Sequence, residues 1–296
     1  MLKQYMYLPA KAAEAAEIAA ERWGISEIRL RPGKRIAVFT DKVYFLTEEG
    51  NISESGGIMV SEEEFRSTFE KMCRYSVYAK QDNLKNGFIP LPCGGRAGVS
   101  GRVAQECGRV SALYDISAIN IRISRQIFTA ADGVIDRIAP SGKVENTLVI
   151  SPPGCGKTTL LREVARLLGG GKYMLRVGII DERCEIAAVS GGVPFYDTGE
   201  LSFVYSACPK AEGMEMALRS MSPDVIICDE IGGEKDVNAL SSAINAGVKI
   251  ICSCHGYDRG DVIRRAVLGT LIEKNIFGRI IVLGRSRGVG TVERIY

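Results

Sequence analysis

Short apolar runs alternate with amphipathic stretches through the second half of the chain. The amphipathic stretches repeat apolar residues every three or four positions, as helices do, whereas the apolar runs have the length of buried strands. These runs lie at residues 147–150, 174–181, 225–229 and 248–254. The alternation is typical of a mostly parallel sheet with helices on both faces, so we predict an α/β domain in this half.

The first half predicts two helices. Residues 9–23 are rich in alanine and amphipathic, and Gly24 is placed to end that helix. A second helix begins after Ser61 and continues to about Met72, because Glu64 follows Ser61 by three positions. This spacing predicts a capping box, in which each side chain binds the backbone N–H of the other residue.

Strands predominate in the remainder of the first half. Residues 27–30 and 35–39 have strand character and are joined by a turn that contains proline and glycine. Residues 87–124 are β-like, with glycines between short strands. This half has no catalytic cluster of its own, and its pattern predicts a smaller α+β domain.

The length of 296 residues suits two domains, since a domain has about 100–200 residues. We place the N-terminal α+β domain at residues 1–125 and the α/β domain at residues 144–296. Residues 126–143 carry glycine, proline and a mixed pattern, so we expect them to form a linker.

One loop motif gives the α/β domain a chemistry. Residues 151–159 have the sequence Ser-Pro-Pro-Gly-Cys-Gly-Lys-Thr-Thr, between a predicted strand and a predicted helix. Glycines let such a loop curl until backbone N–H groups and the helix N-terminus surround an anion. Lys157 then reaches the β- and γ-phosphates of ATP, and the Thr158 hydroxyl coordinates Mg²⁺. Ser151 stands where the usual pattern has glycine. The motif predicts a RecA-like P-loop domain that binds the nucleotide through Pro153, Gly154, Cys155, Gly156, Lys157, Thr158 and Thr159.

A P-loop hydrolase also needs carboxylates at the end of a neighbouring strand. The apolar run at residues 225–229 ends in Asp229 and is followed by Glu230. We predict that Asp229 holds the magnesium ion through its water shell and that Glu230 polarises the attacking water. An Asp-Glu pair alone often caps the next helix, so this prediction depends on its pairing with the loop.

Two further polar segments follow predicted strands of the same sheet. Residues 181–185 are Asp-Glu-Arg-Cys-Glu, and His255 is the only histidine in the chain. Ligands of parallel sheets bind at the carboxyl ends of the strands, where both segments lie. We therefore predict catalytic roles for Glu182 and for His255, the latter as a sensor of the γ-phosphate. The alternative for His255 is a helix-capping or solvent-exposed histidine.

Charge and cysteine content limit the kinds of partner, metal site and cellular compartment that the sequence suits. Lys and Arg number 38 and Asp and Glu 35, a net charge of +3 that gives no strong field for nucleic acid. The nine cysteines are scattered through apolar runs, as reduced thiols of a cytoplasmic protein are. Cys252, Cys254 and His255 have no second ligand pair, so we expect no zinc site. Since no run approaches the roughly 20 apolar residues of a membrane span, we expect a soluble chain.

The second half resembles the type II and type IV secretion ATPase superfamily, which are hexameric motors of secretion and pilus assembly. That superfamily has a Walker A loop, an acidic box, a Walker B segment of the form Pro-Asp-x-x-x-x-Gly-Glu, and a histidine box. The matching segments here are residues 151–159, 181–185, 223–230 and 253–255. The chain departs from the pattern at Asp229, where the superfamily has glycine, and at Val248, where it has a first histidine. These departures indicate a divergent branch.

Over nearly its whole length the chain resembles the stage III sporulation protein AA family of endospore-forming bacteria. The supporting segments are residues 27–33, 94–96, 120–124, 152–159 and 254–256. The resemblance implies an ATP-hydrolysing hexameric motor in the mother-cell cytoplasm, held at the forespore membrane by other proteins of its operon. There it would energise or assemble a channel between mother cell and forespore.

The resemblance also implies arginines that act across a subunit boundary. In secretion ATPases, arginines of the N-terminal domain approach the developing phosphate charge in the neighbouring subunit. Arg122 and Arg96 match the places of these arginines best, and Arg102 is a third candidate. The alternative for each is a surface or structural ion pair.

Two other functions stay open at this point. The first is a nucleic-acid-handling ATPase, since related folds act on DNA and RNA and the chain is slightly basic. We find no interleaved aromatic and basic residues typical of single-strand platforms, so nucleic acid is the less favoured partner. The second is a nucleotide-gated scaffold with little hydrolysis. The retention of Glu230, which only hydrolysis needs, argues against that function.

Overall fold

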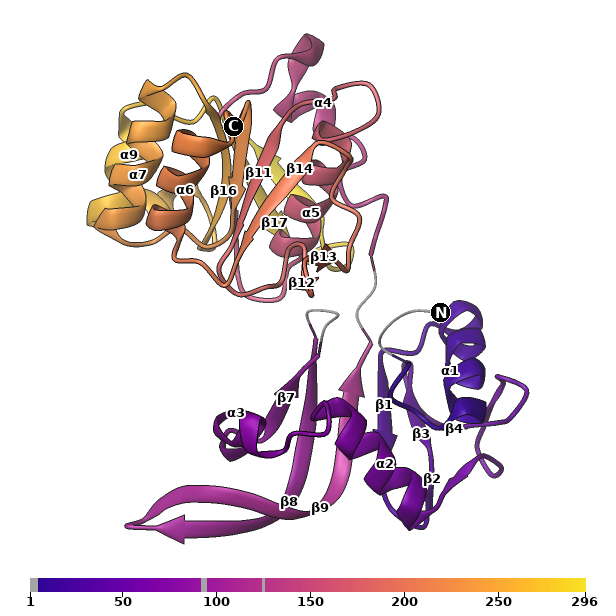
Figure 1. Ribbon diagram of the computed structural model, residues 1–296. Helices are drawn as coiled ribbons and strands as arrows, with labels where there is room; N and C mark the ends of the chain where they lie inside the picture. Colours follow the sequence, from indigo (N-terminus) through magenta and orange to yellow (C-terminus); the bar gives the residue numbers. More distant parts are fainter. Residues whose placement is uncertain (1–4, 92–94, 124–125) are drawn as a thin grey trace. The chain divides into compact units, whose positions relative to one another are not determined.

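The computed structural model describes residues 5–91, 95–123 and 126–296. The chain divides into two compact units, Met1–Arg125 (unit 1) and Gln126–Tyr296 (unit 2). Figure 1 shows an antiparallel sheet with helices in unit 1 and a second sheet between helices in unit 2. Among the described residues, none of the helices combines the length and the apolar character that a membrane span requires.

Unit 1 contains a seven-stranded antiparallel sheet in the order β5-β4-β3-β1-β9-β8-β7. Its strands are β1 (Glu27–Leu30), β3 (Ala37–Phe39), β4 (Val43–Leu46), β5 (Ile52–Ser53), β7 (Phe88–Pro90), β8 (Arg96–Glu106) and β9 (Arg109–Arg122). A separate pair is formed by β2 (Lys34–Arg35) and β6 (Met59–Val60). The β8–β9 hairpin is much longer than its neighbours, so its far end projects beyond the sheet (Figure 1).

The helices of unit 1 are α1 (Ala10–Trp23), α2 (Glu62–Met72) and α3 (Gln81–Lys85), with a short 3₁₀ turn at Tyr78–Lys80. Helix α1 ends at Gly24, which takes the left-handed conformation expected of a C-terminal glycine. The predicted capping box of α2 is confirmed. The Ser61 hydroxyl accepts from the Glu64 N–H at 3.1 Å, and the Glu64 carboxylate accepts from the Ser61 N–H at 2.9 Å.

Alternation along the strands gives the sheet of unit 1 one buried and one open face. Ile28 and Leu30 of β1, Val38 of β3 and Ile119 and Ile121 of β9 are completely buried. Helix α1 packs against β4, and α3 packs against β7 and β9. The residues between the buried positions, among them Arg29, Ala37 and Asn120, point to the opposite face, where they line a hollow.

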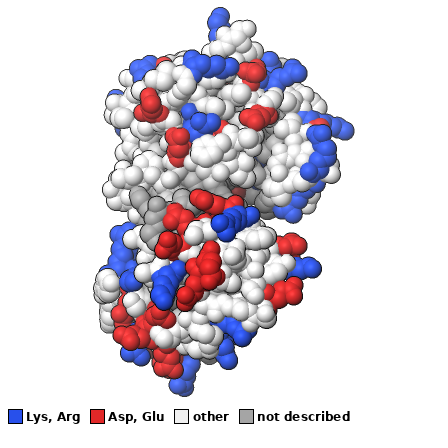
Figure 2. All heavy atoms as spheres, turned by 90° about the vertical axis from the view of Figure 1, so that its right-hand side faces the viewer, with Lys and Arg blue, Asp and Glu red and all other residues white. Residues whose placement is uncertain are grey.

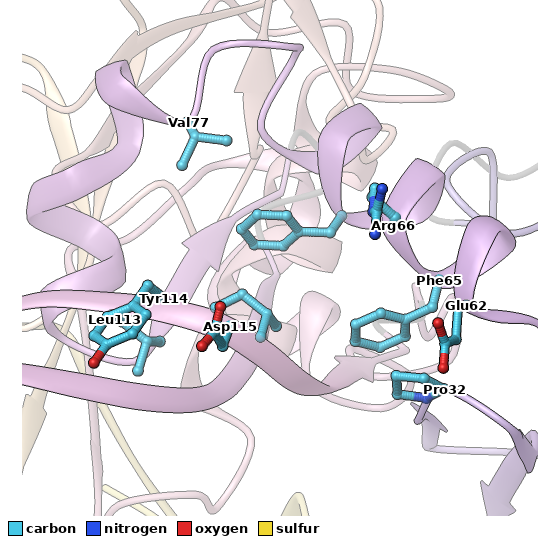
Figure 3. Close-up of a pocket in the computed structure, with 10 residues that line it drawn as sticks. Pro32, Glu62, Phe65, Arg66, Val77, Leu113, Tyr114 and Asp115 are labelled. Atoms are coloured by element: carbon cyan, nitrogen blue, oxygen red, sulfur yellow. The ribbon is translucent and has the colours of Figure 1, made fainter.

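A hollow lies between α2 and the β8–β9 hairpin. Its volume is about 470 Å³. Figure 3 shows Phe65 of α2 and Leu113 of β9 pointing into it, with Glu62, Arg66 and Asp115 at the edges. The hollow therefore has an apolar interior and a rim of mixed charge.

Unit 2 contains the mostly parallel sheet that the sequence predicts. The strand order is β14-β11-β15-β16-β10-β17-β18, and only the pair β17–β18 is antiparallel. The strands are β10 (Thr147–Ser151), β11 (Val177–Asp181), β14 (Ser202–Ser206), β15 (Val225–Cys228), β16 (Lys249–His255), β17 (Arg279–Gly284) and β18 (Thr291–Ile295). A small hairpin of β12 (Val189–Ser190) and β13 (Val193–Pro194) lies outside this sheet.

Helices cover both faces of this sheet, as expected. They are α4 (Ile135–Ile138), α5 (Lys157–Leu168), α6 (Lys210–Ser220), α7 (Glu234–Asn245), α8 (Arg259–Ile263) and α9 (Ala266–Glu273). One core contains Met214 of α6, Leu240 of α7 and Leu271 of α9, and the other contains Leu161 of α5. Figure 1 shows α6, α7 and α9 on one side of the sheet and α4 and α5 on the other.

Residues 126–143, which we expected as a linker, belong to unit 2. Ala131, Val134 and Ile138 are buried in the same core as Leu161. Their spacing of three and four positions is that of one helical face, and α4 begins within it. The nearby glycine and proline residues mask this short pattern in the sequence. The strands β14, β17 and β18 and the helices α8 and α9 were likewise not predicted individually.

The capping box gives a test of unit 1. Ser61→Ala removes the acceptor of the Glu64 N–H, so we expect the free energy of unfolding to fall by about 1 kcal/mol. Trp23, the single tryptophan, lies in unit 1 and provides a fluorescence signal for urea unfolding of that unit. Ser55→Ala, at an exposed position outside the helices of unit 1, is the matched control and is expected to leave the midpoint unchanged. Equal midpoints for all three proteins would contradict the cap's contribution.

Candidate functional site

The P-loop joins β10 to α5. Gly154 and Gly156 have φ values of 70° and 89°, which side chains other than glycine rarely adopt. A Cβ atom on Gly154 would lie 2.7 Å from Nη2 of Arg285, and one on Gly156 would lie 3.4 Å from Cα of Gly290. Helix α5 begins at Lys157 without a side-chain cap, so its first N–H groups are available for an anion.

Lys157 is 6% exposed, and its ammonium group is held by the loop itself. Nζ donates to the Ser151 carbonyl at 3.1 Å, to the Ser151 hydroxyl at 3.3 Å and to the Pro152 carbonyl at 3.3 Å. It also lies 3.1 Å from Nδ1 of His255. Burial lowers the pKa of Lys157, and the nearby Glu230 carboxylate opposes that shift. The lysine is thus pre-positioned, with its donors engaged by groups that a phosphate can displace.

Four side chains form a continuous polar series at the site. His255 Nε2 lies 2.8 Å from one oxygen of Glu230, and Arg183 Nη1 lies 2.7 Å from the other. Because the Lys157 ammonium only donates, Nδ1 of His255 is the acceptor, and the neutral ring carries its proton on Nε2. Both oxygens of the Glu230 carboxylate are therefore occupied by donors. The sequence analysis did not select Arg183, although it lies within the acidic box.

The backbone of Glu230 is strained. Its φ is +33°, in a region that residues other than glycine rarely occupy, and its N–H donates to the Ser253 hydroxyl at 3.1 Å. Such strain persists only where the surroundings fix it, and it is frequent at functional sites. Here it turns the carboxylate toward His255 and Arg183.

Asp229 has the character of a cation ligand. It is 3% exposed, and its Oδ1 is buried without a hydrogen-bond partner among the described residues. Burial raises the pKa of Asp229 to about 6, against the opposing effect of Lys210. An unpartnered buried carboxylate oxygen is costly, and a divalent cation would satisfy it. Among the described residues, no group of three or more His, Cys, Asp or Glu side chains is placed to hold a metal ion.

The loop after β11 is fixed by two buried charges. Both oxygens of Asp181 accept backbone N–H groups of residues 185–188, at 2.8 to 3.4 Å. Arg162 donates to the carbonyls of Glu185 and Ile186, and its guanidinium lies 3.6 Å from the centroid of the Tyr196 ring. These contacts hold the loop that carries Glu182 and Arg183. Glu182 forms an ion pair with Lys210 of α6.

The parallel register brings the predicted residues of unit 2 to one edge of the sheet. Ser151 pairs with His255, and Cys228, which precedes Asp229, pairs with Ile180, which precedes Asp181. Lys157, Glu230 and His255 are in direct contact, and Asp229 and Glu182 extend from the ends of neighbouring strands.

The three candidate arginines belong to unit 1. Arg96 begins β8 and stacks on Phe88 at 4.8 Å, and Arg122 ends β9 with its side chain exposed. Arg102 lies farther along the hairpin and pairs with Asp115 at 3.5 Å. Arg102 thus has a structural partner, whereas the ends of β8 and β9 bring Arg96 and Arg122 to the same end of the sheet.

A family model and a curated relative both match this chain over most of its length. A model of the family described as "Sporulation stage III, protein AA" matches residues 11–296. The chain is 38% identical over 285 residues to stage III sporulation protein AA of Bacillus subtilis (strain 168), covering 95% of this chain and 90% of that protein.

Two solved structures have the same fold. The ATPase DotB of Legionella pneumophila superposes with a TM-score of 0.57 at 19% identity, covering 93% of this chain and 76% of that one. The pilus retraction motor PilT with bound ADP superposes with a TM-score of 0.56 at 18% identity, covering 90% and 77%. The chain therefore has the fold of DotB and PilT, and its mostly parallel sheet with an N-terminal antiparallel unit is the fold class that the sequence predicts.

The raised pKa of Asp229 gives a test by pH. Because the folded-state pKa of about 6 lies above the ordinary value of 3.8, protonation of Asp229 favours folding. Its contribution to stability is complete below about pH 4 and is lost as the pH rises through about 6. Relative to Asp229→Asn, the wild-type protein is expected to lose about 2 kcal/mol of unfolding free energy between pH 4 and pH 7.

Urea unfolding followed by circular dichroism at several pH values measures this difference. Asp224→Asn is the control with the opposite sign, because the hydrogen bond from Arg176 lowers the pKa of Asp224. Wild type is expected to gain stability over that variant as the pH rises. A pH-independent difference between wild type and Asp229→Asn would show that Asp229 does not titrate as described.

Proposed function

The chain belongs to the sporulation stage III protein AA family, and from this membership we propose that it is an ATP-hydrolysing motor of the secretion ATPase type. The observation that carries the proposal is the polar series Lys157–His255–Glu230 beside the unpartnered oxygen of Asp229. A P-loop alone supports nucleotide binding. A carboxylate held beside it, at the end of a neighbouring strand, supports hydrolysis.

In the proposed reaction, the N–H groups at the start of α5 and the Lys157 ammonium bind the β- and γ-phosphates of ATP. Thr158 and Asp229 are the residues that would hold Mg²⁺, which neutralises phosphate charge when bound. The phosphate competes with Ser151 and His255 for the donors of Lys157. When the γ-phosphate binds, the Lys157–His255 contact is lost, and this change reaches Glu230 through its contact with His255.

Glu230 acts as the base in this scheme. Once an oxygen of its carboxylate is released from His255 or Arg183, it orients the attacking water and accepts a proton from it. The products are ADP and phosphate. Glu182, held by Lys210 on the rigid loop, contributes negative charge at the same edge and positions the water network.

The proposed assembly is a hexamer in which each site is completed by the neighbouring subunit. Arg122 and Arg96 of unit 1 are exposed and are the arginines that we assign to the neighbouring site, with Arg102 as the weaker candidate because of its pairing with Asp115. Hydrolysis would then move unit 1 of one subunit against its neighbour.

Family membership supports a role in sporulation. We propose that the protein works in the mother-cell cytoplasm at the forespore membrane, through membrane proteins of its operon, on a channel between the two cells. Figure 2 shows both basic and acidic side chains on the visible face. The near balance of 38 basic and 35 acidic residues gives no strong field for nucleic acid and favours protein partners.

The hydrolysis proposal is tested by phosphate release from ATP across a wide range of protein concentration. If neighbouring subunits complete the site, activity per milligram rises steeply with concentration. Glu230→Gln is expected to lower the rate by at least about 100-fold and to retain ATP binding, because only the base is lost. Activity that is absent in wild type or equal in the variant would contradict the hydrolytic role. Activity that does not change with concentration would contradict completion by a neighbour.

The proposed action of Arg122 in the nucleotide site of the neighbouring subunit is tested with Arg122→Ala. We expect hydrolysis to be abolished while ATP affinity, measured with a fluorescent nucleotide, is unchanged, because the arginine acts on transition-state charge. Arg109→Ala removes an exposed arginine at the opposite end of β9 and is expected to hydrolyse ATP normally. Near-normal turnover of Arg122→Ala would remove this residue from the mechanism.

A further inference from the structure

The open face of the sheet in unit 1 carries a groove remote in sequence from the P-loop. Two adjoining hollows of about 650 and 320 Å³ share Arg29, Arg31, Ala37 and Phe45, so they form one continuous depression. We call it the basic groove. It is built by strand pairing, because one row of facing residues crosses five strands. The row is Phe45, Ala37, Arg29, Asn120 and Gly98.

The charge of the groove has one sign. Arg29, Arg31, Lys34 and Arg35 line it, and the described lining residues include no acidic side chain. Arg29 forms an ion pair with Glu27 at 2.8 Å. The described part of the chain supplies no ion pair to Arg31, Lys34 or Arg35. The groove therefore has three cations available for an anionic ligand.

Its aromatic rings are already covered. The Arg29 guanidinium lies 4.9 Å from the centroid of Phe39, and the Arg35 guanidinium lies 5.3 Å from that of Phe45. Bases of single-stranded nucleic acid need free aromatic faces for stacking, which these rings do not offer on the covered side. A guanidinium stacked on a ring still presents its N–H edge, which suits a carboxylate.

The floor of the groove contains a hydrogen-bond acceptor that has no donor. Asn120 Oδ1 is buried without a hydrogen-bond partner among the described residues, and its neighbours across the sheet include Gly98, which has no side chain. Gly98 and Ala118 allow another backbone to approach closely. Phosphate groups of lipids or nucleic acids offer only acceptors to Asn120, whereas a polypeptide offers backbone N–H donors. The concave shape also disfavours a flat bilayer.

We propose that the basic groove binds an acidic segment of a partner polypeptide. The carboxylates of the segment pair with Arg31, Lys34 and Arg35, its small or apolar side chains cover the floor, and a backbone N–H donates to Asn120 Oδ1. The groove uses no residue of the nucleotide site, so its test stands whatever the outcome for ATP hydrolysis. It also specifies the chemistry by which the proposed motor would recognise a partner.

The test is fluorescence anisotropy with the full chain and a labelled peptide of repeated Glu-Ala-Glu-Leu units. We expect this peptide to bind and the matched Lys-Ala-Lys-Leu peptide not to bind. Arg31→Glu/Lys34→Glu is expected to weaken the acidic peptide by at least about tenfold, because two attractions become repulsions. Lys11→Glu/Arg109→Glu makes the same change in net charge outside the groove and is expected to leave the affinity unchanged.

Asn120→Leu tests whether the peptide binds through a specific hydrogen bond in the groove or only through the positive charge of the surface. It keeps every charge and removes the buried acceptor, so the proposal requires a loss of affinity of at least about threefold. The Trp23 unfolding midpoint of each variant shows whether unit 1 remains folded, and Asn120→Ala, which also removes the acceptor, is used if Asn120→Leu does not fold.

Three results would overturn the proposal. The first is equal binding of the acidic and lysine peptides, or equal binding by the groove and control variants. The second is preferential binding of labelled oligouridine that Arg31→Glu/Lys34→Glu abolishes, which would make the groove a nucleic-acid surface. The third is preferential binding of phosphatidylglycerol vesicles lost in the same variant, which would make it a membrane surface.

Discussion

The parallel pairing of β10, β11, β15 and β16 is the constraint on which the site depends. Each strand ends in a polar residue or is followed by one, and the register sets Asp181 level with Asp229, with Ser151 and His255 two residues further along the same edge. Apolar strand interiors, buried on both faces, fix that register, because a shift would move apolar side chains away from the helices that cover them. The P-loop, the two carboxylates and the histidine are neighbours as a consequence of core packing. Their chemistry therefore needs no long-range hinge within unit 2.

This arrangement buries charged side chains, which costs free energy. Four of them are nearly excluded from solvent: Lys157, Arg162, Asp181 and Asp229. Hydrogen bonds within the fold replace the lost water contacts of Lys157, Arg162 and Asp181. Asp181 and Arg162 keep these bonds permanently and make the loop after β11 rigid. Lys157 and Glu230 instead use partners that a nucleotide can replace. Asp229 keeps an unpartnered oxygen, and this difference separates the structural charges from the charges that are available for a ligand.

In the proposed function, unit 2 supplies the chemistry and unit 1 supplies the recognition. Unit 2 holds the candidate-site residues on strands and a helix terminus, which fix positions well. Unit 1 has an antiparallel sheet with one open face, a long hairpin and exposed arginines, so most of its distinctive features face outward. A motor of the proposed kind needs both parts, since a hydrolytic site without outward-facing surfaces has nothing on which to act. Arg122 and Arg96 lie two residues from Asn120 and Gly98 along β9 and β8, so the candidate arginines adjoin the basic groove on this sheet.

The sequence by itself determined the features that local patterns encode. The P-loop, the strand ending in Asp229, the capping box of Ser61 and the α/β alternation depend on residues close together in the chain, and the fold class followed from them. Contacts between distant residues were decided only by the tertiary structure. Arg183 meets Glu230 because two strands are neighbours in the sheet, and Asn120 faces Arg29 because β9 pairs with β1. Residues 126–138 have a helical pattern that is short and lies close to glycine and proline, so it did not stand out in the sequence, yet Ala131, Val134 and Ile138 pack in the core of unit 2. The physical reason is that propensity and periodicity act over a few residues, whereas register and burial bring together groups that no local pattern relates.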